Sequence, residues 1–168
     1  MDSSRTPSIR HLLIESLQLA GAISVPELNR LARIAANATL APIALVTFVD
    51  DNRQWTPARV GWDGTFMSLA DAFCTHAIEG TSLLEVRQAH RDERFKGSRL
   101  VTGPTAVRSY AGHPIIFSGV AIGTVCILDQ KSRALTHAER EVLGDLAEVA
   151  ADVLLARQYS IAARNQPH

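Results

Sequence analysis

Residues 110–129, YAGHPIIFSGVAIGTVCILD, constrain the fold of this chain more than any other stretch. Two apolar runs, 115–117 and 120–128, are separated by Ser118-Gly119, a dipeptide that interrupts strands rather than continuing them. The sequence therefore predicts a β-hairpin here. In the second run both sets of alternate positions are apolar, so we expect this strand in the middle of a sheet, with neither face in water. The expected faces are Ile122, Cys126 and Leu128 on one side and Ala121, Val125 and Ile127 on the other.

Two residues inside the hairpin predict local irregularity. Gly123 has no side chain to pack, and a glycine within a strand usually marks a bulge or a group that approaches the backbone closely. Pro114 cannot donate a ladder hydrogen bond, so the first strand should be irregular or unpaired on one side at that point. We expect that a cleft could open there.

Length, charge and cysteine content limit the classes of function. A chain of 168 residues suits one domain, which buries roughly 70% of its unfolded surface. Seventeen basic and seventeen acidic residues cancel, so net charge does not attract the chain to nucleic acid or to an anionic membrane. Small molecules and proteins are the expected partners. Cys74 and Cys126 are too few for a disulfide framework and too far apart for a CxxC motif, which fits a reducing cytoplasm, and no signal peptide or membrane span is expected.

Capping patterns predict where the helices begin. Thr6-Pro7 predicts a helix over about 7–21, ended by Gly21, with an apolar face at helical spacing formed by Ile9, Leu12, Leu13, Leu17 and Ala20. A capping box at 24–27 begins a second helix that runs to about Ala38. Another at 136–139 begins a long helix over about 136–160.

The middle of the chain predicts two further strands and a short helix. Residues 43–49 are apolar on both faces and should pair with 54–60 in a hairpin. Ser68–Asp71 resembles a capping box and predicts a short helix with Phe73 and Cys74 on its apolar face, closed by Gly80. A short strand over 83–86 and a long loop over 87–105 should follow, and binding residues often lie on such loops. This order of elements argues for an α+β domain with a mainly antiparallel sheet between helices.

Six short motifs carry a resemblance to a known family. They are Ala41-Pro42-Ile43-Ala44-Leu45-Val46, Arg53-Gln54-Trp55, Phe73-Cys74-Thr75-His76-Ala77-Ile78, Asp92-Glu93-Arg94-Phe95, Tyr110-Ala111-Gly112-His113-Pro114 and Ile122-Gly123-Thr124-Val125-Cys126-Ile127-Leu128-Asp129. Over about residues 9–157 the sequence resembles GAF domains, the small-molecule sensor modules of signalling proteins. The resemblance implies a GAF-like fold, related to PAS domains, with about six strands and helices on both faces. It implies one GAF domain over 1–168, with its core at about 24–135 between the terminal helices.

The resemblance also implies a function. We expect a non-catalytic sensory or regulatory module that binds a small ligand or a partner protein in bacterial-type signal transduction, with a histidine kinase or another signalling protein downstream. Some GAF relatives reduce free methionine sulfoxide with cysteines placed between the short helix and the hairpin, and this chain has none between Ile78 and Tyr110. The alternative is a thiol-based redox sensor or small redox enzyme that uses Cys74. No particular cofactor is indicated.

We expect a pocket between the sheet and the 73–95 region, bordered by His76, Arg108 and Tyr110. The full set of expected ligand-binding residues is Phe73, Cys74, His76, Arg94, Phe95, Arg108, Tyr110 and Thr124. The alternatives are that Cys74 is a small buried hydrophobe and that Arg94 pairs with Asp92 while Phe95 anchors the loop. The histidines lack metal-ligand spacing, so no metal site is predicted. The resemblance to non-catalytic sensor modules implies no catalytic residue.

The terminal helices carry more apolar residues than packing against one sheet requires. One stripe, Leu143, Leu146, Ala147, Ala150 and Leu154, suffices to cover the sheet. The surplus is Val142, Val149, Val153 and Ala156 on the last helix and Ile14 and Leu19 on the first. We therefore expect a homodimer through the terminal helices, with coverage of both faces inside one chain as the alternative.

Overall fold

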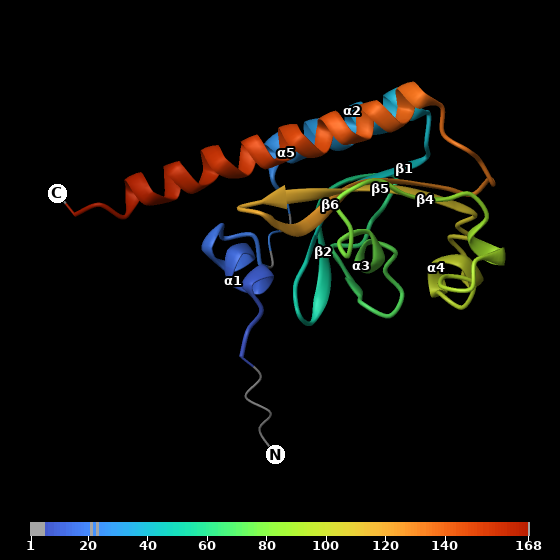
Figure 1. Cartoon of the computed structure of the whole chain (residues 1–168), viewed down its shortest axis with the longest axis horizontal. Coiled ribbons are helices and arrows are strands. Elements are labelled where there is room, and N and C mark those ends of the chain that lie inside the picture. Colours follow the sequence, from blue (N-terminus) through green and yellow to red (C-terminus); the bar gives the residue numbers. More distant parts are fainter. Residues whose placement is uncertain (1–5, 21, 23, 168) are drawn as a thin grey trace, which may run out of the picture.

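In the computed structural model the described residues are 6–20, 22 and 24–167, and they form a six-stranded antiparallel sheet with helices on both faces (Figure 1). The strands are β1 (Ile43–Val49), β2 (Arg53–Val60), β3 (Phe66–Ser68), β4 (Leu84–Val86), β5 (Ser109–Phe117) and β6 (Val120–Asp129). The helices are α1 (Ile9–Ser16), α2 (Pro26–Thr39), α3 (Cys74–Ala77), α4 (Arg99–Thr102) and α5 (His137–Arg164), with a 3-10 turn η1 (Ala89–Arg91).

The sheet confirms the predicted hairpins and the predicted place of the apolar strand. Its order is β3-β2-β1-β6-β5-β4, so β6 lies between β1 and β5. Ser118 and Gly119 form the turn between β5 and β6 with φ of 50° and 77°, the positive values that a tight hairpin turn requires. β4 pairs with β5 only from Tyr110 to Gly112, so Pro114 lies beyond the end of that ladder, as predicted. β3 was not predicted.

Two expected face assignments in β6 are wrong. Cys126 and Leu128 pack on the α3 side and Val125 and Ile127 on the α5 side, as predicted, but Ile122 joins the α5 side and Ala121 the α3 side. The reason is a register shift: Ile115 pairs with Gly123 and the next residue with Ala121, so Ile122 is a bulge residue without a partner on β5. An extra residue reverses the alternation of faces beyond it.

Two long helices cover one face of the sheet. α2 and α5 lie side by side there, and α5 extends beyond the sheet toward the C-terminus (Figure 1). The predicted stripe of α5 is buried against β5 and β6, and its predicted capping box is present between Thr136 and Glu139. α5 ends at Arg164, somewhat later than predicted. No helix in the described ranges is long and apolar enough to cross a membrane.

The beginnings of α1 and α2 differ from the prediction. Ser8, not Thr6, caps α1 by accepting a hydrogen bond from the His11 N–H. α1 ends at Ser16 because Gln18 adopts a positive φ of 54°; the predicted terminator Gly21 lies outside the described residues. The predicted capping box of α2 does not form: Val25 is the N-cap without a side-chain hydrogen bond, and Pro26 occupies the first turn.

The apolar face of α1 and the residues after it agree with the prediction only in part, since Leu17 is buried as predicted. Ile14 and Leu19, predicted as surplus, are fully buried in the core shared with α2 and α5. Ile9 and Leu12, expected to pack inward, are 68% and 51% exposed. The guanidinium of Arg157 on α5 donates to the carbonyl oxygen of Leu17, so α5 holds the chain just after α1.

Short elements cover the opposite face of the sheet. We call α3, η1 and α4 the α3–α4 layer. The predicted helix at Ser68 does not begin there, because the Ser68 hydroxyl bonds the Asp71 carboxylate within a turn instead of capping a helix. α3 begins only at Cys74, so Cys74 lies in its first turn, whereas the predicted start at Ser68 would have placed Cys74 beyond that turn. The predicted loop over 87–105 contains η1 and α4.

Candidate ligand-binding site

A polar cluster lies at the centre of the sheet under the α3–α4 layer. Thr47 on β1 is the register partner of Thr124 on β6, and their hydroxyl oxygens are 2.9 Å apart. Thr124 Oγ1 donates to Cys74 Sγ at 3.2 Å, and the Tyr110 hydroxyl donates to the same sulfur at 3.2 Å. Cys126 Sγ lies 3.8 Å from Cys74 Sγ. All five side chains are buried.

This arrangement makes the two thiols chemically different. Burial raises the pKa of Cys74, but hydrogen bonds from Cys126, Thr124, Tyr110 and Thr47 outweigh burial and lower the pKa from 9.0 to about 7. Burial and the neighbouring Cys74 raise the pKa of Cys126 well above that of an ordinary thiol. Within this pair Cys74 is therefore the group that ionises first.

Three aromatic rings seal the cluster from solvent. Phe73 and Phe95 stack with centroids 4.3 Å apart, and Phe73 stacks on Tyr110 at 5.1 Å. The His76 ring meets the outer side of Phe95 edge-on at 4.8 Å. Phe73 and Phe95 are almost completely buried, so their rings lie on the side of the α3–α4 layer that faces the sheet.

A cavity of about 10 Å³ remains between the rings and the sheet, close to the volume needed for one water molecule. Its walls are Leu45, Gln54, Met67, Phe73, Cys74, Leu100, Tyr110, Cys126 and Leu128. Gln54 is 2% exposed, and its Oε1 has no hydrogen-bond partner. A buried carbonyl oxygen without a partner is costly, and such a group in a native fold calls for an explanation.

The structure brings five of the eight expected site residues into this cluster: Phe73, Cys74, Phe95, Tyr110 and Thr124. The other three lie outside it. His76 packs on the outer side of Phe95. Arg94 is exposed and forms a two-pronged ion pair with Asp92, which lowers the pKa of that carboxyl group. Arg108 precedes β5 and donates to the carbonyl oxygens of Val101 and Val107, so it does not border the cavity.

Sequence reasoning missed Gln54, Thr47 and Cys126 as site residues. A threonine in the middle of each of two otherwise apolar runs was the available signal for Thr47 and Thr124. No comparable signal marks Gln54, because the burial of its strand on both faces is a tertiary property.

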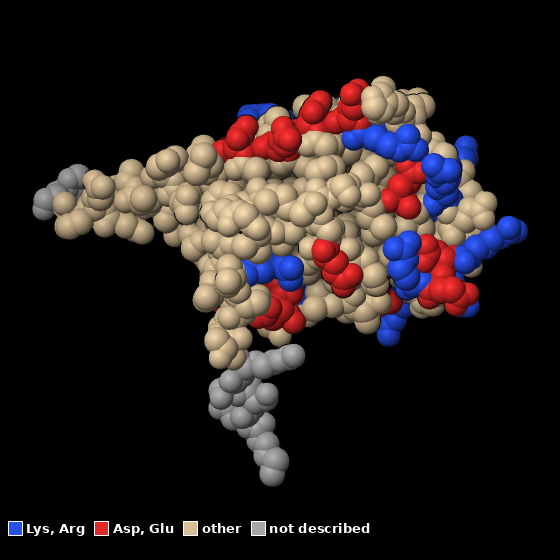
Figure 2. All heavy atoms as spheres, viewed as in Figure 1, with Lys and Arg blue, Asp and Glu red and all other residues tan. Residues whose placement is uncertain are grey.

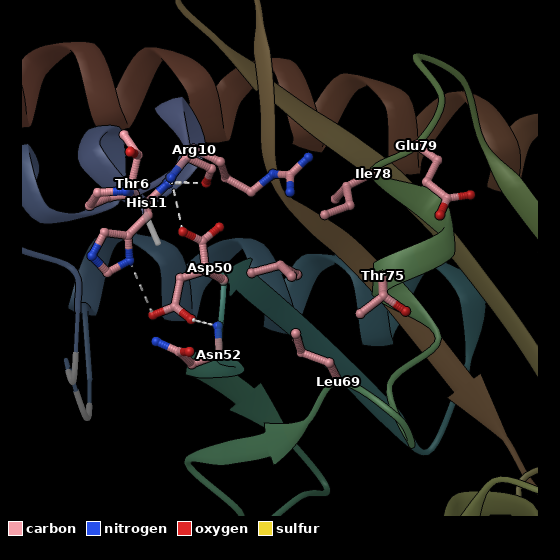
Figure 3. A pocket seen from close by; sticks show the side chains of 13 residues that line it. Thr6, Arg10, His11, Asp50, Asn52, Leu69, Thr75, Ile78 and Glu79 are labelled. Carbon is pink, nitrogen blue, oxygen red and sulfur yellow. Dashed lines mark hydrogen bonds and ion pairs between the residues drawn. The ribbon is translucent and has the colours of Figure 1, made fainter. Parts of the chain in front are cut away.

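A second, open pocket of about 690 Å³ lies where α1 meets the β1–β2 turn and α3 (Figure 3). Arg10 and His11 of α1, Asp50 of the turn and Glu79 just after α3 line it. Asp51 of the turn lines it as well. Most of its polar groups already have partners. Asp50 accepts from the Asn52 and Arg53 backbone N–H groups and from the Trp55 indole.

Two further bonds in this pocket attach α1 to the sheet. The Ser8 N–H donates to Asp51, and hydrogen bonding from Ser8 lowers the pKa of that carboxyl group. Arg10 Nε donates to the carbonyl oxygen of Ala121 at 2.7 Å. The polar groups of this pocket thus serve to attach α1 to the sheet. Nowhere in the described ranges do three or more His, Cys, Asp or Glu side chains gather as a metal site would require.

The antiparallel six-stranded sheet between a long-helix face and a short-helix face is that of a GAF domain. The family model described as "GAF domain" matches residues 17–154, and the chain belongs to this family. A curated relative, a cyclic di-GMP phosphodiesterase of Pseudomonas aeruginosa, is 35% identical over 125 residues, which are 74% of this chain and 21% of that protein. The chain therefore spans about a fifth of the length of that relative.

Solved structures agree on the fold. The GAF domain of a phosphoenolpyruvate-protein phosphotransferase from Coxiella burnetii superimposes with a TM-score of 0.67 at 16% identity, covering 93% of this chain and 99% of that one. A free methionine-R-sulfoxide reductase from Neisseria meningitidis, solved with its substrate, also has a TM-score of 0.67, at 14% identity and with 93% and 96% covered. At such identities these likenesses establish the fold alone.

Proposed function

We propose that this chain is a non-catalytic regulatory GAF module that binds a small ligand between the sheet and the α3–α4 layer. The observation that carries the proposal is the Oε1 atom of Gln54, buried without a partner at the wall of a cavity. A bound donor would satisfy this oxygen and remove its cost in the unliganded fold.

The cavity walls suggest the class of ligand. They carry aromatic rings, apolar side chains, a hydroxyl, thiols and an amide, but no Lys, Arg, His, Asp or Glu. An anionic ligand would find no opposite charge in the cavity, and the partly ionised Cys74 thiol is the one counter-charge among these wall residues for a cation, so an uncharged ligand is favoured. A flat, uncharged heteroaromatic molecule with an N–H group fits best, because its ring would stack on Phe73 or Tyr110 while the N–H donates to Gln54.

Room for such a ligand requires movement of the α3–α4 layer. α3 and α4 have four residues each and η1 has three, whereas the helices on the opposite face have 14 and 28 residues. Short elements joined by loops open at lower free energy than long packed helices. The layer therefore opens without disruption of the α2–α5 core.

Native mass spectrometry of freshly purified protein, followed by thermal-shift measurements with uncharged heteroaromatic compounds, tests the proposal. We expect a retained small molecule or a ligand that raises the melting temperature. Gln54→Leu should abolish that rise while stabilising the unliganded protein by about 1 kcal/mol, because it removes the unpaired buried oxygen. Lys96→Gln is the matched control, since Lys96 is exposed, lies outside the cavity and should leave binding unchanged. A full response in Gln54→Leu would contradict the assignment.

We further propose that the output passes through the terminal helices to a second copy of the chain and then to a signalling protein of the cytoplasm, such as a histidine kinase. Val149 and Leu155 on α5 and Ile9 and Leu12 on α1 expose apolar side chains that a dimer would cover. The projecting part of α5 shows uncharged side chains on the face in Figure 2, whereas charged side chains gather over the η1 and α4 end. Two free thiols fit a reducing compartment.

A further inference from the structure

The two cysteines of the chain meet across the boundary between the sheet and the α3–α4 layer. Cys126 lies in the central strand β6, and Cys74 is the first residue of α3. They are 52 positions apart in the sequence, yet their sulfur atoms are 3.8 Å apart. Both thiols are free and buried. The two sulfur atoms are thus in contact, but no disulfide bond joins them.

The surroundings assign a different role to each thiol. Cys74 Sγ accepts hydrogen bonds from the hydroxyl groups of Tyr110 and Thr124, and such bonds stabilise the thiolate form that reacts with oxidants. The lowered pKa of Cys74 and the raised pKa of Cys126 agree with this division. Cys126 keeps its proton and stands beside Cys74 as a second thiol. A reactive thiol next to a resolving thiol is the arrangement that redox-sensing cysteines use.

We infer that Cys74 and Cys126 form a reversible intrachain disulfide when the protein meets a hydroperoxide. In the first step the Cys74 thiolate attacks the terminal peroxide oxygen, an S–O bond forms and the O–O bond breaks. Hydroxide (from hydrogen peroxide) or alkoxide (from an alkyl hydroperoxide) leaves and takes up a proton to become water or an alcohol. Cys74 is then a sulfenic acid. In the second step the Cys126 sulfur attacks the Cys74 sulfur, an S–S bond forms, the S–O bond breaks, and the hydroxyl leaves with the thiol proton as water. The two thiols lose two electrons, which reduce one hydroperoxide to water and, for an alkyl hydroperoxide, an alcohol.

The geometry requires only a small movement of α3. A disulfide has an S–S length of about 2.05 Å, so the sulfur atoms must approach by roughly 1.8 Å. β6 is hydrogen-bonded on both edges, to β1 and to β5, whereas α3 is a single turn of helix in the surface layer. The cavity beside Cys74 lies on the same side, where a peroxide, little larger than water, reaches the sulfur when the layer opens.

The disulfide would tie α3 to the centre of the sheet. The α3–α4 layer would then be unable to lift, so oxidation would hold the module in its closed form. This inference stands on the two thiols and does not depend on whether a ligand binds in the cavity.

The test uses the native full chain. Reduced protein is treated with a small excess of hydrogen peroxide, quenched with an alkylating reagent in denaturant, and measured by intact-mass spectrometry without reductant. We expect a chain lighter by two hydrogen atoms with no alkyl group attached, and recovery of two alkylated thiols after dithiothreitol. Peptide mapping should join Cys74 to Cys126.

Two variants assign the roles. Cys126→Ala should stop at the sulfenic acid on Cys74, which dimedone captures, and Cys74→Ala should leave Cys126 unoxidised at the same peroxide dose. Wild-type protein oxidised after unfolding in guanidinium provides a comparison that needs no variant: the native chain should form the disulfide faster. Two alkylated thiols after peroxide treatment, a covalent dimer, a sulfinic acid without the disulfide, or disulfide formation only in the unfolded chain would each overturn the inference.

Discussion

The carbonyl oxygen of Thr47 on β1 lies 1.8 Å from the position that a β-carbon on Gly123 of β6 would occupy. The obstructing atom belongs to the backbone of the neighbouring central strand, so it cannot move aside as a side chain would. The position of Gly123 inside an apolar strand had indicated that another group approaches its backbone closely, and that group is the β1 backbone.

Gly123→Ala should therefore lower the free energy of unfolding by about 3 kcal/mol, at the upper end of the usual cost of overpacking, because β1 and β6 must separate at their centre. Guanidinium denaturation followed by circular dichroism measures the change. Gly97→Ala is the control, since nothing lies within 4 Å of its β-carbon position. Equal midpoints for the two variants would show that the strands accommodate the methyl group.

The Cys74 thiol should make the free energy of unfolding of the reduced protein increase with pH near neutrality. Its pKa is lowered in the folded chain to about 7 from 9.0, so the stabilisation that it contributes is complete above the unfolded pKa and is lost as pH falls through about 7. The free energy of unfolding of the reduced wild type should rise relative to Cys74→Ala between about pH 6.5 and 8.5, by on the order of 1 kcal/mol.

Cys126 and Tyr110 have the opposite effect, because their pKa values are raised in the folded chain and their contribution to stability falls as pH rises. This loss occurs mainly at a pH above the window. Denaturation series at several pH values, with reductant present, provide the measurement. A difference between wild type and variant that stays constant over the window would mean that Cys74 keeps its proton.

Phe95 should control how fast Cys74 reacts with thiol reagents. Its ring stacks on Phe73, directly above the cluster, so Phe95→Leu loosens the α3–α4 layer and lowers the free energy of local opening. We expect Cys74 to react about tenfold faster with a disulfide reagent, which corresponds to about 1.4 kcal/mol of easier opening.

Lys96→Gln should leave the reaction rate of Cys74 nearly unchanged, because the exposed ion pair between Lys96 and Glu93 contributes little. Stopped-flow or spectrophotometric thiol titration of the native proteins distinguishes the two variants. If Phe95→Leu reacts at the wild-type rate, the reagent reaches Cys74 by another route.

Val149→Glu should convert a dimer to monomers. Val149 is 44% exposed on α5, and a charge there would be buried without a partner in an interface built on the terminal helices. Multi-angle light scattering at micromolar concentration should give the mass of two chains for the wild type and of one chain for the variant.

Leu40→Glu is the matched control for the dimer. Leu40 is 86% exposed at the end of α2, outside the terminal helices, so its replacement should leave the mass unchanged. Leu19→Glu is unsuitable despite the surplus predicted from sequence, because Leu19 is buried and its replacement would unfold the chain. A wild-type mass of one chain would contradict the dimer.

The sequence by itself determined the features that depend on residues close to one another along the chain. The β5–β6 hairpin follows from a Ser118-Gly119 turn between apolar runs, and the start of α5 from the capping box of Thr136 and Glu139. Local patterns gave a wrong helix start where the expected capping side chain formed a different hydrogen bond. Ser68 bonds Asp71 within a turn and leaves the start of α3 to Cys74.

Only the tertiary structure decided the chemistry of the site. Thr47 and Thr124 are 77 positions apart, and it is the pairing of β1 with β6 that places their hydroxyl groups in contact. The same pairing places Cys126 under α3, where Cys74 meets it and two hydroxyl groups. The burial of Gln54 results from packing on both faces of β2, which no periodicity in that strand reveals. Local propensities specify strands and turns, but hydrogen bonding and burial at a site depend on which distant segments pack together.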